Sequence, residues 1–566
     1  MEETNYLFSW LDYIVFGLML GISVIIGIYF AMCGKSQNSA DEYLKGGKTM
    51  KVLPIAVSLI ASQIATSTLL AVPSDVYRFG ANYLWLGVAT LFMCFLGYHI
   101  FLPVFFKLQI TSVFEYLHLR FNKTVRIVAS FFNLLGMFIY CPIVIYIPSL
   151  AFAQVTQGNP LVIACVSCAI CIFYTTIGGF RAVVWTDTLQ FIIMALSFFL
   201  LFCIGISAID GFEVLWNTSI EGHRLDIFDF SFDPTLRDSF GAIMIGGTFY
   251  WLTITCIDPV CVQKFLSVPT LSDVKKVIVI YAFGVASIHV LSALTGLLMY
   301  AKYWNCDPFS AKKIFNSDQL VPYFVMDVAG NIPGYSGVFM AGVFSAGLST
   351  LSASLNTMSA IIYQDFVSLF ISKNISQARV TTILKTIVVV TGTIATVLVF
   401  ALKNINGIFP IYTGIYAATL GPTLGLFLLG VLVPLANSKG ALYGSLTGSI
   451  FILFVFIQNQ RHQSDAYLGQ FLKPISTDGC NVSLTNNATK IEIPGDLPFF
   501  LYRISFWFNT FMGTMVTVVV GIIISWFTKH DKIPVSRDLL SPLIHSFIKD
   551  VPKEKDVNCA LKLLQS

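Results

Sequence analysis

The most regular feature of the chain is the alternation of long apolar runs with short polar segments. A helix needs about 20 apolar residues to cross the ~30 Å hydrocarbon core of a bilayer. Thirteen runs meet this description and are predicted to span a membrane. They cover residues 10–32, 52–72, 81–108, 127–155, a fifth run that ends at 178–179, a sixth that follows it directly, and then 240–257, 277–300, 339–363, 380–402, 409–435, 441–457 and 504–527.

The composition indicates an all-α polytopic membrane protein. Of the 566 residues, 56% are hydrophobic and 11% are charged, and the mean hydropathy is +0.77, which no water-soluble core of this size requires. The net charge of +4 is small and scattered along the chain, so we expect the lipid bilayer as a partner and no nucleic acid. No polar segment is long enough to hold a soluble catalytic domain, and we therefore expect that the protein is not an enzyme.

Basic residues in the loops predict the orientation of the chain. Lys45, Lys48 and Lys51 precede the second run, and Lys529 and Lys532 follow the last one. Cytoplasmic loops carry an excess of Lys and Arg, so both segments are predicted to lie inside the cell. The prediction is therefore a multi-pass plasma membrane protein with an extracellular N-terminus and a cytoplasmic C-terminus.

Two loops predicted to be extracellular carry candidate modification sites. The segment 210–239 contains a glycosylation sequon at Asn217, and the loop before the last run contains sequons at Asn481 and Asn487. Cys306 and Cys480 are the two cysteines that fall in predicted outer loops. They are either bridged to each other or free thiols, and the sequence leaves both alternatives open.

The run 339–363 is long enough to cross a bilayer, yet its middle is rich in hydroxyl groups. Ala346, Ser349 and Thr350 stand at positions i, i+3 and i+4, so on a helix one carbonyl and two hydroxyls face the same way. Small hard cations take such oxygen ligands. The alternative is that small residues here let helices pack closely, with hydroxyls bonded to their own backbone.

The second run is also unusually polar for a helix that faces lipid. Polar or irregular backbone at membrane depth is tolerated only where it lines a cavity or is buried in protein. We therefore expect a break in this helix near residues 61–65. The seventh run is predicted to end at Asp258 and Pro259 near the cytoplasm. Two such runs, five apart and of opposite direction, indicate an inverted five-helix repeat. The predicted divisions are 1–51 (first span and cytoplasmic loop), 52–209 (first repeat), 210–239 (extracellular loop), 240–435 (second repeat), 436–527 (last two spans and their loop) and 528–566 (cytoplasmic tail).

Asp187 lies just inside the sixth run. An ionisable group within a membrane span is costly, so a functional role is one interpretation. The other is a structural ion pair with Arg181 at the membrane face, and the sequence favours neither.

The predicted solute pocket offers no Lys or Arg at mid-membrane depth. An anion would have to bind at the N-termini of half-helices and at hydroxyls such as those of Thr66, Ser67 and Thr68. An aromatic wall for the solute is one interpretation of several side chains, and packing between helices is the other. These are Tyr140, Tyr250, Trp251, Tyr412 and Tyr416.

Five motifs resemble the sodium:solute symporter family over nearly the whole chain. They are ASQIATSTLLAVPSDVYRFG from Ala61, IYCPIVIYIPSL from Ile139, GGFRAVVWTD from Gly178, GLSTLSASLN from Gly347 and GPTLGLFLLGVLVP from Gly421. The resemblance is greatest to the branch of sodium-coupled monocarboxylate, multivitamin and iodide cotransporters. It implies a LeuT-like fold and uptake driven by Na+.

The same resemblance implies roles for individual residues. The conserved sodium site of the family would use the backbone carbonyls of Ala61, Ile64 and Ala346 and the hydroxyls of Ser349 and Thr350. Asp187 matches a residue on the sodium exit path to the cytoplasm. Four further positions match the solute pocket or a second ion site: Tyr140 and Thr68 for the pocket, and Ser352 and Asn356 for either.

The chain departs from the branch around the pocket. Cys141-Pro142 stands where the branch usually has Thr-Gly, Ala153-Gln154 replaces a common Asn-Gln pair, and Ile257-Asp258-Pro259 replaces Thr-Asn-Gln or Thr-Asp-Gln. The resemblance therefore implies less about the solute than about the ion.

Together these observations predict a sodium-coupled symporter that imports a small organic anion by alternating access, with a monocarboxylate such as lactate or a short-chain fatty acid as the first choice. A vitamin such as pantothenate or biotin, or iodide, is the alternative, and a sugar is less favoured. A sodium-gated sensor or leak channel is the rival from another class. The sequence does not indicate the oligomeric state.

Overall fold

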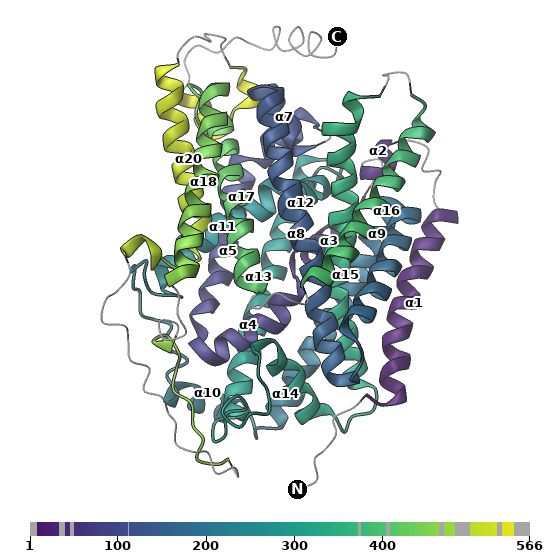
Figure 1. Cartoon of the computed structure of the whole chain (residues 1–566), viewed down its shortest axis with the longest axis vertical. Helices are drawn as coiled ribbons and strands as arrows, with labels where there is room; N and C mark the ends of the chain where they lie inside the picture. Colours follow the sequence, from purple (N-terminus) through teal and green to yellow (C-terminus); the bar gives the residue numbers. More distant parts are fainter. Residues whose placement is uncertain are drawn as a thin grey trace.

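The computed structural model describes residues 8–32, 40–45, 50–110, 112–371, 375–402, 408–462, 469–480, 499–528 and 535–547, and this part of the chain contains helices and no strand. The long elements run side by side (Figure 1). They are α1 (Trp10–Met32), α3 (Val52–Gln63), α4 (Thr66–Phe79), α5 (Trp85–Ile100), α8 (Lys123–Thr156), α9 (Pro160–Ser207), α13 (Leu271–Lys302), α15 (Tyr335–Ile361), α16 (Gln377–Leu402), α17 (Ile408–Leu432), α18 (Ser438–His462) and α20 (Phe508–Phe527).

Shorter helices connect or extend these elements. They are α2 (Ala40–Lys45), α6 (Leu102–Leu108), α7 (Val113–Arg120), α10 (Phe212–Glu221), α11 (Thr248–Leu252), α12 (Pro259–Phe265) and α14 (Leu320–Ala329), with the π-helical segments η3 (Ala242–Gly247) and η4 (Thr253–Ile257).

Among the described residues, nine helices are long and apolar enough to cross a membrane, or eleven if each of two bent pairs is one span. The fifth and sixth predicted spans form one helix, α9, of 48 residues. The backbone kinks at Gly179, whose φ of 58° is a conformation that residues with a side chain rarely adopt. The apolar part of α17, Tyr416–Leu432, is shorter than the other spans. The all-helical membrane class is confirmed, and the count of thirteen spans stays a prediction.

The expected break in the second span is present. Helices α3 and α4 meet at an angle of 56°, with Ile64 and Ala65 in extended conformations between them. The seventh span has a matching break, because α12 leaves the preceding helical segment at 57°. Each break lies between two helical halves, as discontinuous helices in transporters do.

The prediction that the seventh span ends at Asp258 and Pro259 is wrong. Asp258 is extended and caps α12, accepting a hydrogen bond from the Val260 amide at 2.8 Å, and Pro259 fills the first position of that helix. Both residue types favour a helix start as much as a helix end. The span therefore continues to Phe265, and all seven residues of α12 are buried.

The hydroxyl-rich run forms the centre of the molecule. In the apolar 18-residue stretch of the span that contains α15, 94% of the residues are buried inside the protein. In the corresponding stretch of α1, 28% are buried. Helix α15 packs against α8, α9 and α1. Its Ser and Thr side chains therefore face protein rather than lipid. An ion site on α15 requires its ligands to be buried in this way.

In Figure 1 the yellow-green segment 469–480 of the loop before α20 runs along the lower left edge of the molecule. Cys480 in this loop forms a disulfide with Cys306, which follows α13, so the bridged alternative is the one found. Neighbouring backbone bonds, from Gly479 to Asn305 at 2.8 Å and from Asp307 to Ser476 at 3.1 Å, fasten the same two segments. The segment after α13 and the loop before α20 are thus joined both covalently and through their backbones.

Helices α18 and α20 approach each other closely because glycines stand at their contact. A Cβ atom on Gly444 would lie 2.7 Å from the carbonyl oxygen of Thr517 and 3.0 Å from the Cα of Gly521. These are backbone atoms that cannot move aside without separating the helices. Small residues that let backbones approach are the usual basis of helix packing in membranes.

We expect Gly444→Ala to destabilise the protein by about 1–3 kcal/mol, the usual effect of overpacking a tight contact. Gly17 on α1 is the matched control, since a Cβ there has nothing within 4 Å. Gly17→Ala should be neutral or slightly stabilising because Ala favours helices. The measurement is the melting temperature of each purified variant in detergent. Equal melting temperatures would contradict the close-packing argument.

Candidate functional site

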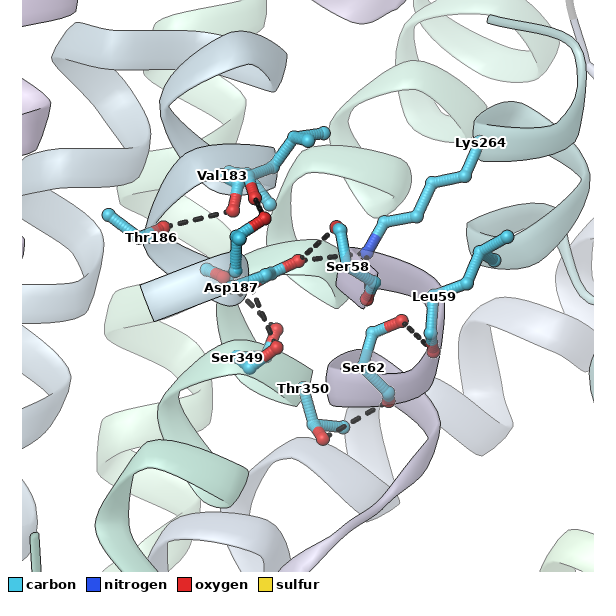
Figure 2. A network of polar contacts seen from close by, with 12 residues as sticks. Ser58, Leu59, Ser62, Val183, Thr186, Asp187, Lys264, Ser349 and Thr350 are labelled. Atoms are coloured by element: carbon cyan, nitrogen blue, oxygen red, sulfur yellow. Dashed lines mark hydrogen bonds and ion pairs between the residues drawn. The ribbon is translucent and has the colours of Figure 1, made fainter. Parts of the chain in front are cut away.

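A single buried carboxylate, that of Asp187 on α9, joins four helices. It accepts hydrogen bonds from Ser58 of α3 at 2.7 Å and from Ser349 of α15 at 2.7 Å. Lys264 of α12 donates to it at 2.8 Å, in an ion pair whose side chains are 0% (Asp187) and 2% (Lys264) exposed. Figure 2 shows the carboxylate between these three partners. The partners replace the hydration that burial removes.

This geometry corrects two interpretations of the sequence. Arg181 does not pair with Asp187, because its guanidinium lies 3.4 Å from Glu42 instead. Lys264 does not lie beyond the end of the seventh span, where the predicted end at Asp258 and Pro259 would place it, since it belongs to α12 and donates to the Ser58 carbonyl at 3.0 Å as well as to Asp187. The sequence missed the pair because Asp258 and Pro259 were interpreted as a helix end.

The predicted sodium ligands lie where α15 meets the first break. All five are buried, with exposed fractions from 0% to 4%. The hydroxyl oxygen of Thr350 lies 3.2 Å from the carbonyl oxygen of Ser62 and 3.0 Å from that of Ala346, so its single proton has two acceptors within reach. The Ser62 carbonyl belongs to the last turn of α3, next to Ala61. The structure thus brings the end of α3 into hydrogen-bonding contact with the hydroxyl-bearing face of α15.

The oxygen atoms at this junction are suitable ligands for a small hard cation. The last carbonyls of a helix lack donors within that helix, and α3 ends at Gln63, so the carbonyls of Ala61 and Ile64 are of this kind. A hydroxyl that donates one hydrogen bond keeps lone pairs for a cation, which applies to Ser349 and Thr350. Every ligand in the set is a neutral oxygen, as Na+ prefers.

The two breaks border one cavity. The amide of Gln63, at the end of α3, donates to the sulfur of Cys261 in α12 at 2.9 Å, and this contact sets the first break against the second. The cavity has a volume of about 190 Å³, below the ~300–1,000 Å³ of pockets for drug-sized molecules. It can hold a small solute.

Five of the predicted solute residues line this cavity: Thr68, Tyr140, Tyr250, Trp251 and Tyr416. The rings of Tyr140 and Tyr416 are stacked with centroids 5.6 Å apart, so the α8 and α17 walls meet there. The aromatic residues therefore border the space that a solute would occupy, in addition to packing between helices.

The other predicted residues lie elsewhere. Thr66 is turned towards α15, where its hydroxyl donates to the Val343 carbonyl at 3.4 Å. Ser352 donates to the Ser349 carbonyl at 3.0 Å and is fully buried. Asn356 is also buried, and none of the three is among the described residues that line the main cavity. The side chain of Tyr412 lies outside the described part of the chain.

Several lining residues were missed by the sequence analysis. Asp258 faces the cavity because the break turns it there, and Asp75 reaches it from α4. His289 of α13 lines it too, with its Nδ1 3.0 Å from the Tyr83 hydroxyl. The segment at the start of α20 contributes Trp507. The hydrophobic pattern of the last span does not indicate that Trp507 lines a cavity. Asp258 was noticed in the sequence, but it was interpreted as the end of a helix.

An ion-pair cluster borders the cavity at Asp75. Arg237, in the segment between α10 and η3, lies 2.8 Å from Asp75 and 2.7 Å from Asp238. Burial alone would lower the pKa of Arg237, but Asp238 and Asp75 outweigh it and raise the pKa. The guanidinium therefore stays charged, and Asp75 on the cavity wall shares it with Asp238.

Of the predicted glycosylation sites, Asn217 is exposed on α10. Asn481 and Asn487 lie outside the described residues. The structure is thus compatible with modification at Asn217, and the other two sites stay predictions.

Comparison with known proteins places the chain among sodium symporters. The family model described as the sodium:solute symporter family matches residues 43–448. Among curated proteins, the chain is 37% identical to the human sodium-coupled monocarboxylate transporter 2, over 93% of this chain and 85% of the relative. It is 35% identical to the zebrafish (Danio rerio) protein of the same name over 95% and 87%, and 31% identical to the human sodium/iodide cotransporter over 94% and 85%.

Solved structures show the same fold. A Na+-coupled sialic acid symporter in a substrate-bound outward-open state matches with a TM-score of 0.75 and 22% identity, over 92% of this chain and 98% of that one. Mhp1, a nucleobase-cation-symport-1 family transporter, matches with a TM-score of 0.54 and 12% identity, over 89% and 98%. The LeuT-like fold that the resemblance to the family implied is confirmed.

We expect Lys264→Met to destabilise the protein by about 3–5 kcal/mol, because it leaves the Asp187 charge buried without a partner. The double variant Asp187→Asn with Lys264→Met removes both charges and should recover most of this loss. Arg181→Met is the control for a partly exposed ion pair, and it should cost at most about 1 kcal/mol. Melting temperatures of the purified variants test this, and a double variant no more stable than Lys264→Met would contradict it.

Proposed function

Because the chain belongs to the sodium:solute symporter family, we propose that it carries a small organic monocarboxylate into the cell together with Na+ by alternating access. Na+ is the coupling ion of the family. The observation that carries the proposal is the meeting of two broken helices at one small cavity, with the buried Ser349 and Thr350 beside the first break.

Sodium binds between the end of α3 and the middle of α15 in this proposal. The carbonyls of Ala61, Ile64 and Ala346 and the hydroxyls of Ser349 and Thr350 hold the ion. Such an ion joins a half-helix of the first repeat to a helix of the second, so its arrival favours one arrangement of the two repeats. Moving one charge through 100 mV supplies about 2.3 kcal/mol for this change.

Asp187 lies on the inward path of the ion. Its carboxylate accepts the hydrogen bond of Ser349 at 2.7 Å, so it is one contact away from the proposed ligands. Lys264 holds the same carboxylate from the opposite break. A sodium ion that leaves its ligands meets this negative group first, and the exit of the ion then involves both broken helices.

The solute lies in the cavity between the breaks. Its carboxylate is placed at the start of α4, where Ala65 provides no side-chain cap and the first amides of the helix lack partners within the helix. The hydroxyls of Ser67 and Thr68 line the cavity at this point. The relatives named as monocarboxylate transporters support this class of solute. Ser352 and Asn356 are assigned to a second ion, since neither lines the cavity.

The protein is a multi-pass membrane transporter, and the plasma membrane is its proposed location. The basic segments before the second span and after the last one support a cytoplasmic C-terminus and an extracellular N-terminus. The exposed position of Asn217 agrees with this orientation. The sodium-gated sensor or leak channel remains the rival function, and it differs by failing to accumulate solute.

Uptake into proteoliposomes tests the proposal. The labelled panel comprises lactate, butyrate, alanine, pantothenate, biotin, iodide and glucose, each measured with an inward sodium gradient and with potassium in its place. We expect sodium to raise the accumulation of at least one carboxylate by roughly tenfold or more, as about 1.4 kcal/mol of coupling provides. Sodium-dependent current without accumulation would identify the rival channel, and accumulation of glucose alone would contradict the solute class.

The double variant Ser349→Ala with Thr350→Ala should raise the sodium concentration for half-maximal uptake by roughly tenfold or more, because two ligands of the ion are lost. Ser287→Ala is the matched control, since this serine is exposed on α13 and donates only to the Phe283 carbonyl of its own helix. An unchanged sodium dependence, with normal amounts of folded protein, would exclude these ligands.

A further inference from the structure

The charge of the cavity wall is the feature that the proposed function does not use. Among the described lining residues, Asp75 and Asp258 are the charged side chains, and neither Lys nor Arg is among them. Asp75 has an ion-pair partner in Arg237 at 2.8 Å. Asp258 has no ion-pair partner in the described part of the chain, where Lys264 of the same helix pairs with Asp187.

The second break holds Asp258 at the cavity. One carboxylate oxygen accepts the Val260 amide at 2.8 Å, which fixes the side chain where the backbone turns. The residue is 6% exposed, so bulk water does little to disperse its charge. A carboxylate has about four acceptor positions. The capping bond therefore leaves it able to bind a donor from a ligand.

Aromatic rings surround the same space. Seven lining residues are aromatic: Tyr83, Tyr140, Tyr250, Trp251, Tyr416, Phe506 and Trp507. The faces of such rings attract cations, and amines carried by ligands are commonly held in this way. A buried carboxylate within an aromatic wall is thus suited to a cationic group.

A simple monocarboxylate fits this wall poorly. It offers no cationic partner to Asp258, and burial without such a partner disfavours the ionised carboxylate. An ionised Asp258 would also repel the negative charge of the solute. A cationic group on the same solute removes the conflict, because it lies between the two carboxylates.

We propose that the solute is a zwitterion, a small molecule in which one carboxylate and one protonated or quaternary amine are joined. The amine binds Asp258 and the aromatic wall at the second break, and the carboxylate binds Ser67, Thr68 and the first turn of α4 at the first break. The Gln63–Cys261 contact of 2.9 Å sets these two ends of the cavity close together. This inference rests on the proposed function and narrows its solute class.

Matched pairs of solutes test the inference in proteoliposomes that contain the full chain. Glycine betaine and 3,3-dimethylbutyrate have the same shape and differ in the positive charge, and alanine and lactate differ in an ammonium against a hydroxyl. We expect sodium-driven uptake of the amine-bearing member to exceed that of its partner by roughly tenfold or more. Competition against the better substrate gives the same ranking without any variant.

Asp258→Asn removes the charge and keeps an oxygen that can cap α12. We expect this variant to raise the KM for the zwitterions by roughly tenfold or more, the effect of losing a hydrogen bond to a charged group, and to reduce the preference within each pair to about twofold. Glu213→Gln is the control, because Glu213 is an exposed carboxylate on α10 away from the cavity.

The outcomes distinguish a failure of the zwitterion inference from a failure of the symporter proposal. The inference is overturned if the wild type takes up lactate or 3,3-dimethylbutyrate as well as or better than the amine-bearing partner, or if competition gives that ranking. The symporter proposal is then left intact. Preferences in Asp258→Asn that equal those of the wild type also overturn the inference. No sodium-driven uptake of any member of either this set or the earlier panel overturns the proposed function, and the inference fails with it.

Discussion

The arrangement of the molecule depends on the compensation of one buried charge. The buried carboxylate of Asp187 is compensated by Lys264, Ser58 and Ser349, which supply a cation and two hydroxyl donors. These partners come from α12, α3 and α15, so satisfying the carboxylate positions a half-helix of each broken span and the central helix at once. The proposed ion site lies directly beside this junction. The requirement for charge compensation thus explains why the ion ligands on α15 face the first break.

The chemistry of the protein is divided between two kinds of polar environment. The proposed ion site is made of neutral oxygens buried between helices, one of them on Thr350, which also lines the cavity. The cavity wall is made of aromatic rings, hydroxyls and two carboxylates. Asp187 and Lys264 form an ion pair near the ion, whereas Asp258, beside the solute space, has no ion-pair partner among the described residues. Because the ion and the solute contact opposite sides of the same break, each affects the helix that the other binds.

The sequence predicted the parts that follow from local pattern. The apolar runs and the hydroxyl spacing on 339–363 anticipated the helices and the buried face of α15, and the polar second run anticipated its break. The continuation of the seventh span failed, because Asp258-Pro259 begins a helix as readily as it ends one. The pairing of Lys264 with Asp187 and the contribution of Trp507 depend on contacts between distant segments, which no local pattern records.

The disulfide between Cys306 and Cys480 has a consequence for the compartment that each end of the protein faces. Disulfides persist in oxidising surroundings and are reduced in the cytosol. In Figure 1, α10, α14 and the start of α1 lie at the same end as the bonded segments, and α20 finishes at the other end. With the proposed orientation the bond stays in the oxidising medium. In the reversed orientation cellular thiols would open it, and the two segments would lose their covalent link.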